Sequence, residues 1–176
     1  EINQPFARIA GRSHGLQQHM AYFKRINAIN YVLAHDDGVN PKNFAEADII
    51  LIGVSRTGKT PTCLYLAMQY GIAAANYPLT EEDMSLIRLP KLLESVQNKL
   101  FGLTLSATQL HLIRQERRPN SEYASLAQCQ REIQWQQSLF KQVGIPYLDT
   151  TSISIEEISA IILDRSGLKR QLYGFG

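Results

Sequence analysis

The sequence predicts an α/β fold in which a parallel sheet is flanked by helices and preceded by an N-terminal helical extension. Hydrophobic residues make up 44% of the 176 residues and charged residues 19%, as expected of one globular domain with a sizeable core. From residue 49 onward, short apolar runs alternate with helical stretches, and this alternation favours right-handed crossovers between parallel strands. A glycine-containing loop, residues 53–60, lies between the first apolar run and the next helix.

The first part of the chain is predicted to be mainly helical. Residues 1–15 show no clear pattern. A helix is predicted over residues 16–34, where apolar side chains recur on one face at Tyr22, Ile26, Ile29 and Leu33. A loop over residues 36–48 follows. We therefore divide the chain into a helical extension, residues 1–45, and a domain that carries the glycine-containing loop, residues 46–176.

The remaining elements follow from short local patterns. Apolar runs of the kind buried in parallel sheets predict strands over residues 49–52, 72–75, 100–105 and 145–148. Helices are predicted between and after these strands, over residues 60–69, 106–116, 123–142 and 154–167. Ser106 with Gln109, and Ser154 with Glu157, match the capping box that opens a helix.

The glycine-containing loop matches the P-loop pattern G-x-x-x-x-G-K-[ST], which makes the fold P-loop kinase-like. Its glycines let successive backbone N–H groups converge on phosphate oxygens, and the following helix adds its N-terminal partial charge. Lys59 is expected to neutralise the terminal phosphates, Thr60 to ligate Mg²⁺, and Arg56 to reach the transferred phosphoryl group. The residues expected to bind the nucleotide are Gly53, Val54, Ser55, Arg56, Thr57, Gly58, Lys59 and Thr60.

An acidic turn precedes the loop and is the expected source of the carboxylates that phosphoryl transfer requires. His35, Asp36, Asp37 and Gly38 follow the first helix, where acidic side chains oppose the helix dipole. A solvated helix end closed by Gly38 is the alternative. In the functional interpretation, one Asp accepts the proton of an attacking hydroxyl, the other helps to hold Mg²⁺, and His35 orients or charges the pair. The pattern does not decide which aspartate has which role. We assign Asp37, with Thr60, to the metal.

Other polar residues have less specific interpretations. Arg114, Arg117 and Arg118 end a predicted helix, either as partners of its dipole or as an anion-binding segment that closes over phosphates. Asp149 is interpreted as a strand end and turn rather than a metal ligand. Trp135 and its neighbouring glutamines are interpreted as helix packing and surface.

Composition excludes several classes of protein. The net charge of +2 does not favour a nucleic-acid surface, and no apolar run approaches the roughly 18 residues that span a bilayer. Cys63 and Cys129 are far apart and form no metal or disulfide motif, so buried thiols and a cytoplasmic location are expected.

Several segments together resemble the bacterial phosphoenolpyruvate synthase regulatory proteins. The similar segments cover most of the chain: residues 35–38, 50–67, 74–78, 99–104, 120–124, 145–147 and 154–157. Gly58, where the sister regulators of pyruvate, phosphate dikinase tend to have Ser, favours the synthase branch. The family carries a further N-terminal region, which we expect the parent of this chain to have as well.

The resemblance implies a bifunctional enzyme with ADP, Mg²⁺ and inorganic phosphate as its small ligands. Such an enzyme transfers the β-phosphate of ADP to a threonine of phosphoenolpyruvate synthase, and it removes the phosphate by phosphorolysis, which releases pyrophosphate. We expect one site to serve both reactions, so Lys59→Ala should abolish both. A homodimer is one open possibility for the assembly.

Three other functions remain open from the sequence. The chain could instead regulate pyruvate, phosphate dikinase. A small-molecule P-loop kinase shares the loop, the sheet and an arginine-bearing lid, although such kinases usually begin at the P-loop strand. A nucleotide-binding switch without turnover is the third, and it would tolerate loss of Asp36 and Asp37.

Overall fold

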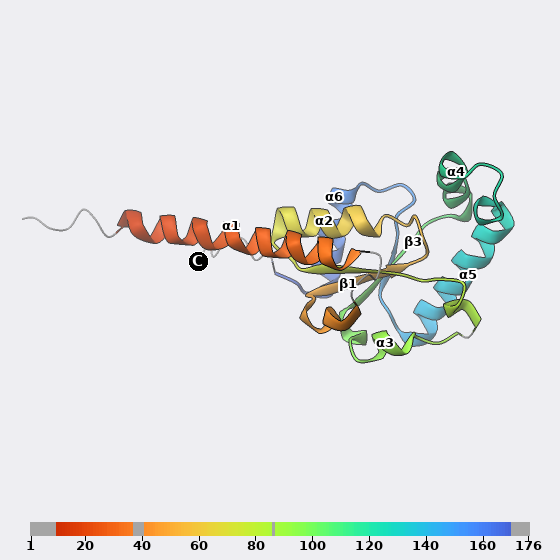
Figure 1. Ribbon diagram of the computed structural model, residues 1–176, viewed down its shortest axis with the longest axis horizontal. Helices are drawn as coiled ribbons and strands as arrows, with labels where there is room; N and C mark the ends of the chain where they lie inside the picture. The colour runs from red at the N-terminus through yellow and green to blue at the C-terminus, as the bar shows by residue number, and fades with distance from the viewer. Residues whose placement is uncertain (1–9, 37–40, 86, 170–176) are drawn as a thin grey trace, which may run out of the picture.

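The computed structural model describes residues 10–36, 41–85 and 87–169, and Figure 1 shows their arrangement. One parallel sheet has the strand order β2-β1-β3-β4. Its strands are β1 (Ile49–Gly53), β2 (Ala74–Pro78), β3 (Leu100–Thr104) and β4 (Tyr147–Asp149). The chain goes from β1 to one side of the sheet and later returns to the other side. The carboxyl end of β1 is therefore the switch point at which α/β sheets bind ligands.

Helices cover both faces of this sheet. The α-helices are α1 (Ala10–Ala34), α2 (Lys59–Tyr70), α3 (Lys91–Glu94), α4 (Ala107–Arg117), α5 (Leu126–Val143) and α6 (Ile155–Ser166). Short 3₁₀ helices are η2 (Pro41–Glu46), η3 (Asp83–Ser85), η4 (Gln97–Lys99) and η5 (Glu122–Ala124). In Figure 1, α2 and α6 lie on one side of the sheet and α3 on the other. The predicted α/β architecture is confirmed.

The core has two halves because every residue of β1 is buried. Ile49 and Leu51 pack toward α1, α2 and α6, in a cluster that includes Val32, Leu66 and Ile162. Ile50 and Ile52 point the other way, into a cluster with side chains from α3, α4 and α5. A strand that is buried on both faces reads as a continuous apolar run, which is why the sequence shows no alternation there.

The first helix is longer than predicted and presents a different face to the core. It begins at Ala10 rather than at residue 16, and Figure 1 shows its N-terminal half extending beyond the sheet. The predicted apolar face is wrong for Tyr22 and Leu33, which are 59% and 65% exposed, whereas Ile29 does pack against the core. The buried face instead carries Ala28 and Val32, which pack against α2 and β2. Apolar spacing cannot show which side of a helix meets a neighbouring element.

Other boundaries differ by a few residues. The second and fourth strands begin at Ala74 and Tyr147, two residues later than predicted, because pairing with β1 and β3 sets their limits. The helix predicted from residue 123 begins at Leu126, with Ser125 as its N-cap. The caps predicted at Ser106 and Ser154 are confirmed, since each hydroxyl accepts a hydrogen bond from the third following N–H. The division between residues 45 and 46 stays a prediction.

Candidate active site

The loop between β1 and α2 depends on two glycines. A Cβ atom at Gly53 would collide with the carbonyl oxygen of Leu103 on the neighbouring strand. Gly58 caps α2 with φ of 88°, a left-handed conformation that side chains disfavour. The loop therefore turns sharply and directs the N-terminus of α2 toward the space above the sheet, which is the arrangement that binds phosphate groups.

Two side chains of the loop are turned inward. The buried ammonium of Lys59 donates a hydrogen bond of 2.9 Å to the carbonyl oxygen of Val54. The hydroxyl of Thr57 donates to the same oxygen at 3.1 Å. Lys59 thus lies across the loop where a phosphate group would be held, and its charge is already inside the binding site.

The acidic turn reaches the loop through Asp36. Its Oδ1 accepts hydrogen bonds from the Thr60 hydroxyl at 2.8 Å and from the Asn76 side-chain amide at 2.7 Å. The Asn76 amide also donates to the Thr60 hydroxyl at 3.0 Å. Three segments that are separate in sequence, the turn after α1, the middle of β2 and the start of α2, therefore converge on one oxygen-rich position. The carboxylate and hydroxyl oxygens are hard ligands that fit Mg²⁺.

His35 fastens the end of α1 to the sheet. Its buried ring stacks on Tyr31 with centroids 3.9 Å apart, and its Nδ1 donates to the Tyr31 carbonyl oxygen at 2.8 Å. The His35 carbonyl oxygen accepts from the backbone N–H of Asn76 at 3.3 Å. Burial, together with the charges of Glu46 and Asp48, raises the pKa of Tyr31 to about 12. These contacts set the position of the adjacent Asp36.

A cavity of about 610 Å³ opens above the loop. It brings together six of the predicted site residues with four that the sequence interpretation did not assign to it, Pro61, Asn76, Pro78 and Arg117. Its lining consists of Asp36, Ser55, Arg56, Gly58, Lys59, Thr60, Pro61, Asn76, Pro78 and Arg117. The lining does not include the predicted residues His35, Gly53, Val54 and Thr57. Arg56 is exposed and has φ of 76°, a left-handed conformation that is strained for a non-glycine residue. Among the described residues, Lys59 and the two arginines give the cavity three cationic groups, against one carboxylate from Asp36.

A second cavity, of about 490 Å³, lies at the opposite end of the sheet. It is lined by residues at the amino ends of strands, among them Ile49, Leu100 and Pro146. Parallel sheets bind ligands at their carboxyl ends, so the cavity above the loop is the candidate active site.

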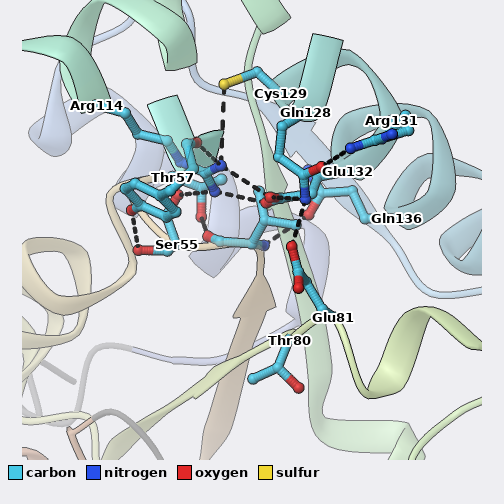
Figure 2. A network of polar contacts seen from close by, with 12 residues as sticks. Ser55, Thr57, Thr80, Glu81, Arg114, Gln128, Cys129, Arg131, Glu132 and Gln136 are labelled. Atoms are coloured by element: carbon cyan, nitrogen blue, oxygen red, sulfur yellow. Dashed lines mark hydrogen bonds and ion pairs between the residues drawn. The ribbon is translucent and has the colours of Figure 1, made fainter. Parts of the chain in front are cut away.

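The back of the loop is held by buried polar side chains of α5. The Gln136 Oε1 atom accepts from the backbone N–H of Val54 at 2.9 Å, and its Nε2 donates to the Thr104 hydroxyl at 2.9 Å. Figure 2 shows Gln136 and Glu132 on α5 facing the segment that carries Ser55 and Thr57. The start of the loop is thereby joined to both β3 and α5.

Arg114 of α4 completes this support. Its guanidinium is fully buried and pairs with both oxygens of Glu132, at 2.9 and 2.6 Å. It also donates to the carbonyl oxygens of Ser55 at 3.2 Å and Tyr123 at 3.0 Å. Burial alone would lower the pKa of Arg114, but its hydrogen bonds and ion pair with Glu132 raise the pKa overall. Arg114 is therefore neither an exposed partner of the helix dipole nor part of a mobile lid.

The three clustered arginines thus have separate environments. Arg117 lines the cavity, whereas Arg118 lies 6.0 Å from the centroid of the Tyr123 ring. Tyr123 stacks on Arg114 at 4.0 Å, and its hydroxyl is hydrogen-bonded to the Ser55 hydroxyl at 2.8 Å. The sequence shows the cluster but not this division, because helical spacing alone does not say which arginine faces the loop.

Asp149 and Gln136, which the sequence interpretation also covers, do not line the cavity. Asp149 is exposed at the end of β4, and its carboxylate accepts a hydrogen bond from the N–H of Thr151, as in a turn. The assignment of the glutamines near Trp135 to packing and surface is wrong for Gln136, which is fully buried and bonded to the loop. Asp37 and Gly38 lie outside the described residues.

Two other kinds of site are absent from the described ranges. No cluster of three or more histidine, cysteine, aspartate or glutamate side chains there is arranged to hold a metal ion. None of the helices found in those ranges has the length and apolar character needed to cross a bilayer. Cys63 and Cys129 are both buried free thiols.

Comparison with known proteins points to one family. The family described as kinase/pyrophosphorylase matches residues 1–163. Proteins of Nitrosomonas eutropha and Nitrosomonas europaea, provisionally named phosphoenolpyruvate synthase regulatory proteins, are each 58% identical to this chain over 173 residues. A protein of the same name from Laribacter hongkongensis is 53% identical over 171 residues. These matches cover 97 to 98% of this chain but only 62 to 63% of each relative.

Proposed function

This chain belongs to the kinase/pyrophosphorylase family, and from that premise we propose that it regulates phosphoenolpyruvate synthase by reversible phosphorylation. In one direction it would phosphorylate a threonine of the synthase with ADP. In the other it would use inorganic phosphate to remove that group as pyrophosphate. Relatives that are 53 to 58% identical bear the name of regulators of that synthase, which supports this target. The chain spans about 63% of the first relatives' length, so the activity and partner of the whole protein are part of the proposal.

The observation that carries the proposal is the contact between Asp36 and Thr60 beside Lys59. A P-loop needs a carboxylate near its Ser or Thr to hold Mg²⁺. Asp36 supplies one from the end of α1, at 2.8 Å from the Thr60 hydroxyl. Mg²⁺ bound between these oxygens would neutralise charge on the phosphate groups. The sequence does not decide which aspartate ligates the metal, and Asp37 is the residue assigned to it. The contact favours Asp36 there and leaves Asp37 to accept the proton.

The forward reaction then follows from the arrangement of the loop. The β-phosphate of ADP is its terminal phosphate and would lie among the loop N–H groups with Lys59. The threonine Oγ attacks the β-phosphorus, the bond between that phosphorus and the bridging oxygen breaks, and AMP leaves. The hydroxyl proton passes to a carboxylate of the acidic turn. Arg56, on the rim, would stabilise the charge of the moving phosphoryl group.

The reverse reaction would use the same loop with a different nucleophile. An oxygen of inorganic phosphate attacks the phosphorus of phosphothreonine, and the bond from that phosphorus to the threonine Oγ breaks. The freed threonine oxygen takes up the proton that the attacking hydrogen phosphate loses, and the new P–O bond gives pyrophosphate. Both directions place a phosphoryl group beside Lys59, so the Lys59→Ala variant is expected to lose both activities.

The proposal is tested with the full-length parent, phosphoenolpyruvate synthase, Mg²⁺, and ADP or ATP in separate reactions. Phosphothreonine detected by mass spectrometry with ADP, and its phosphate-dependent loss with release of pyrophosphate, is the expected result. An Asp36→Asn variant should keep the fold but require at least about tenfold more Mg²⁺, since it loses one charged ligand. If only pyruvate, phosphate dikinase is modified, that enzyme and not the synthase is the target. No modification of either protein would refute the proposal.

A further inference from the structure

We propose that Arg117 and Arg56 form a second anion subsite beside the P-loop, which takes a phosphate dianion while the loop holds another phosphoryl group. The dianion is either inorganic phosphate or the phosphate ester of a phosphorylated side chain, since the two present the same oxygens. The inference rests on the proposed function, because only phosphorolysis brings two separate phosphate groups into the cavity. It assigns Arg117 to phosphate binding, a role that the sequence pattern leaves undecided between three neighbouring arginines.

The first argument is the position of the two guanidinium groups. Arg56 belongs to the loop, Arg117 to the last turn of α4, and both line the cavity of about 610 Å³. Both side chains are exposed, and neither has a hydrogen-bond or ion-pair partner among the residues that the structure describes. Arg114 is the contrast, because both of its Nη groups are already bonded to Glu132 and to backbone carbonyl oxygens. The donors of Arg56 and Arg117 are available to a ligand.

The second argument is that α4 is fixed to the loop by Arg114, one turn before Arg117. Residues three apart on a helix lie on the same face, so Arg114 and Arg117 are neighbours along one side of α4. Figure 2 shows the buried end of this side, where Arg114 meets Glu132 and the loop segment with Ser55. Because Arg114 ties α4 to the loop itself, Arg117 is held at the mouth of the cavity. The strain at Arg56 likewise persists in a loop that is fixed by its surroundings.

The third argument is the charge that each reaction brings into the cavity. Phosphorylation combines ADP with a neutral hydroxyl. Phosphorolysis combines inorganic phosphate with a phosphate ester, each carrying about −1.5 to −2 at neutral pH. Lys59 lies within the loop, bonded to the Val54 carbonyl oxygen, and serves the phosphoryl group held there. The second phosphate needs other cations, and planar guanidinium groups bind such oxygens in a bidentate way.

The test compares Arg117→Gln with Arg118→Gln in the full-length parent. Arg118 has the same charge one position along the chain, but it lies toward Tyr123 rather than lining the cavity. We expect Arg117→Gln to slow phosphorolysis at least about tenfold, as for the loss of a charge-assisted hydrogen bond, and to change the KM for ADP much less. Arg118→Gln should leave both reactions unchanged, and Arg117→Lys should restore part of the phosphorolysis.

The kinetic constants distinguish the two sources of the dianion. A raised KM for inorganic phosphate in Arg117→Gln would place free phosphate at the subsite. A raised KM for the phosphorylated protein, with that for phosphate unchanged, would place the phosphate ester there. If Arg117→Gln behaves like Arg118→Gln, or if it weakens phosphorylation and phosphorolysis equally, the subsite is refuted.

Direct binding separates this inference from the proposed function. Calorimetric titration with inorganic phosphate alone should find two phosphates per chain in the unmodified protein and one in Arg117→Gln. This readout does not depend on turnover. Two sites in a protein without regulatory activity would support the subsite and refute the proposed function. One site in both proteins, with the activities intact, would refute the subsite and leave the proposed function standing.

Discussion

Arg56 combines a strained backbone conformation with a position in the lining of the cavity. Its φ of 76° is costly for a residue with a Cβ atom, yet the side chain has no hydrogen-bond or ion-pair partner among the described residues. A glycine would adopt this conformation freely. If Arg56 binds phosphate as proposed, stability and activity should respond to its replacement in opposite directions.

Replacement of Arg56 separates these two effects. Arg56→Gly removes both the strain and the charge, whereas Arg56→Ala removes the charge and keeps the strain. We expect the glycine variant to be more stable than the alanine variant by about 1 kcal/mol, as measured by urea unfolding. Both should lose phosphorolysis to a similar extent. Equal stability of the two variants would show that the loop relaxes and stores no strain at this position.

Cys63 provides a second residue-level prediction. Its buried Sγ donates to the Ala75 carbonyl oxygen at 3.5 Å, and burial, with a smaller effect from the charge of Asp36, raises the thiol pKa. The raised pKa stabilises the fold fully below the pKa of the unfolded thiol, about 8.5, and this contribution declines as pH rises further. Cys63→Ala should weaken the decline of stability between pH 8.5 and 10, measured by urea unfolding. An unchanged decline would mean that the thiol is not its cause.

At the scale of the elements, α4 and α5 act together as the support of the loop. The pair of Arg114 and Glu132 lies between them, and Gln136 links α5 to the loop N–H of Val54. A buried ion pair contributes little net stability compared with apolar side chains of similar size, because both charges lose their hydration. Its value here lies in fixing the loop carbonyl of Ser55 relative to the two helices.

A double-mutant cycle tests this interpretation. Arg114→Met leaves the Glu132 charge buried without its partner and should cost about 3 to 5 kcal/mol in urea unfolding. Arg114→Met combined with Glu132→Leu should recover most of that stability. The double variant should still bind ADP more weakly than the unmodified protein, since the Ser55 carbonyl oxygen has lost its donor. Full ADP affinity in a stable double variant would mean that the pair is purely structural.

At the scale of the whole molecule, the site depends on how α1 packs. Asp36 follows the last turn of α1, and Val32, one turn earlier, is buried in the same cluster as Ile49 and Leu66. The packing of α1 around Val32 therefore holds Asp36 beside Thr60 of the loop. Loss of that packing should lower stability and Mg²⁺ affinity together.

Val32→Ala and Leu33→Ala form a matched pair for this prediction. Val32 is 2% exposed and Leu33 is 65% exposed. We expect Val32→Ala to lower the free energy of unfolding by about 2 kcal/mol and to raise the Mg²⁺ concentration needed for ADP binding. Leu33→Ala should change stability by less than about 0.5 kcal/mol. An equal effect of the two substitutions would contradict the packing of α1 described above.

The sequence by itself determined the features that depend on neighbouring residues. The buried run before Gly53, the loop pattern through Thr60, and the caps at Ser106 and Ser154 are local, because each is set by a few consecutive side chains and backbone angles. Together they were enough for the fold class and for the position of the phosphate loop. They also indicated the acidic turn as a source of carboxylates, although they could not choose between its two aspartates.

Only the tertiary structure decided which distant side chains complete the site. Asn76 joins Asp36 across 40 positions of sequence, and Gln136 joins Val54 across 82. The same holds for the buried face of α1, and for the burial of Arg114 while Arg117 lines the cavity. A polar residue on a helix has the same local pattern whether it faces water or a buried N–H group. Its role is set by what the fold packs against it, and that is a property of the whole chain.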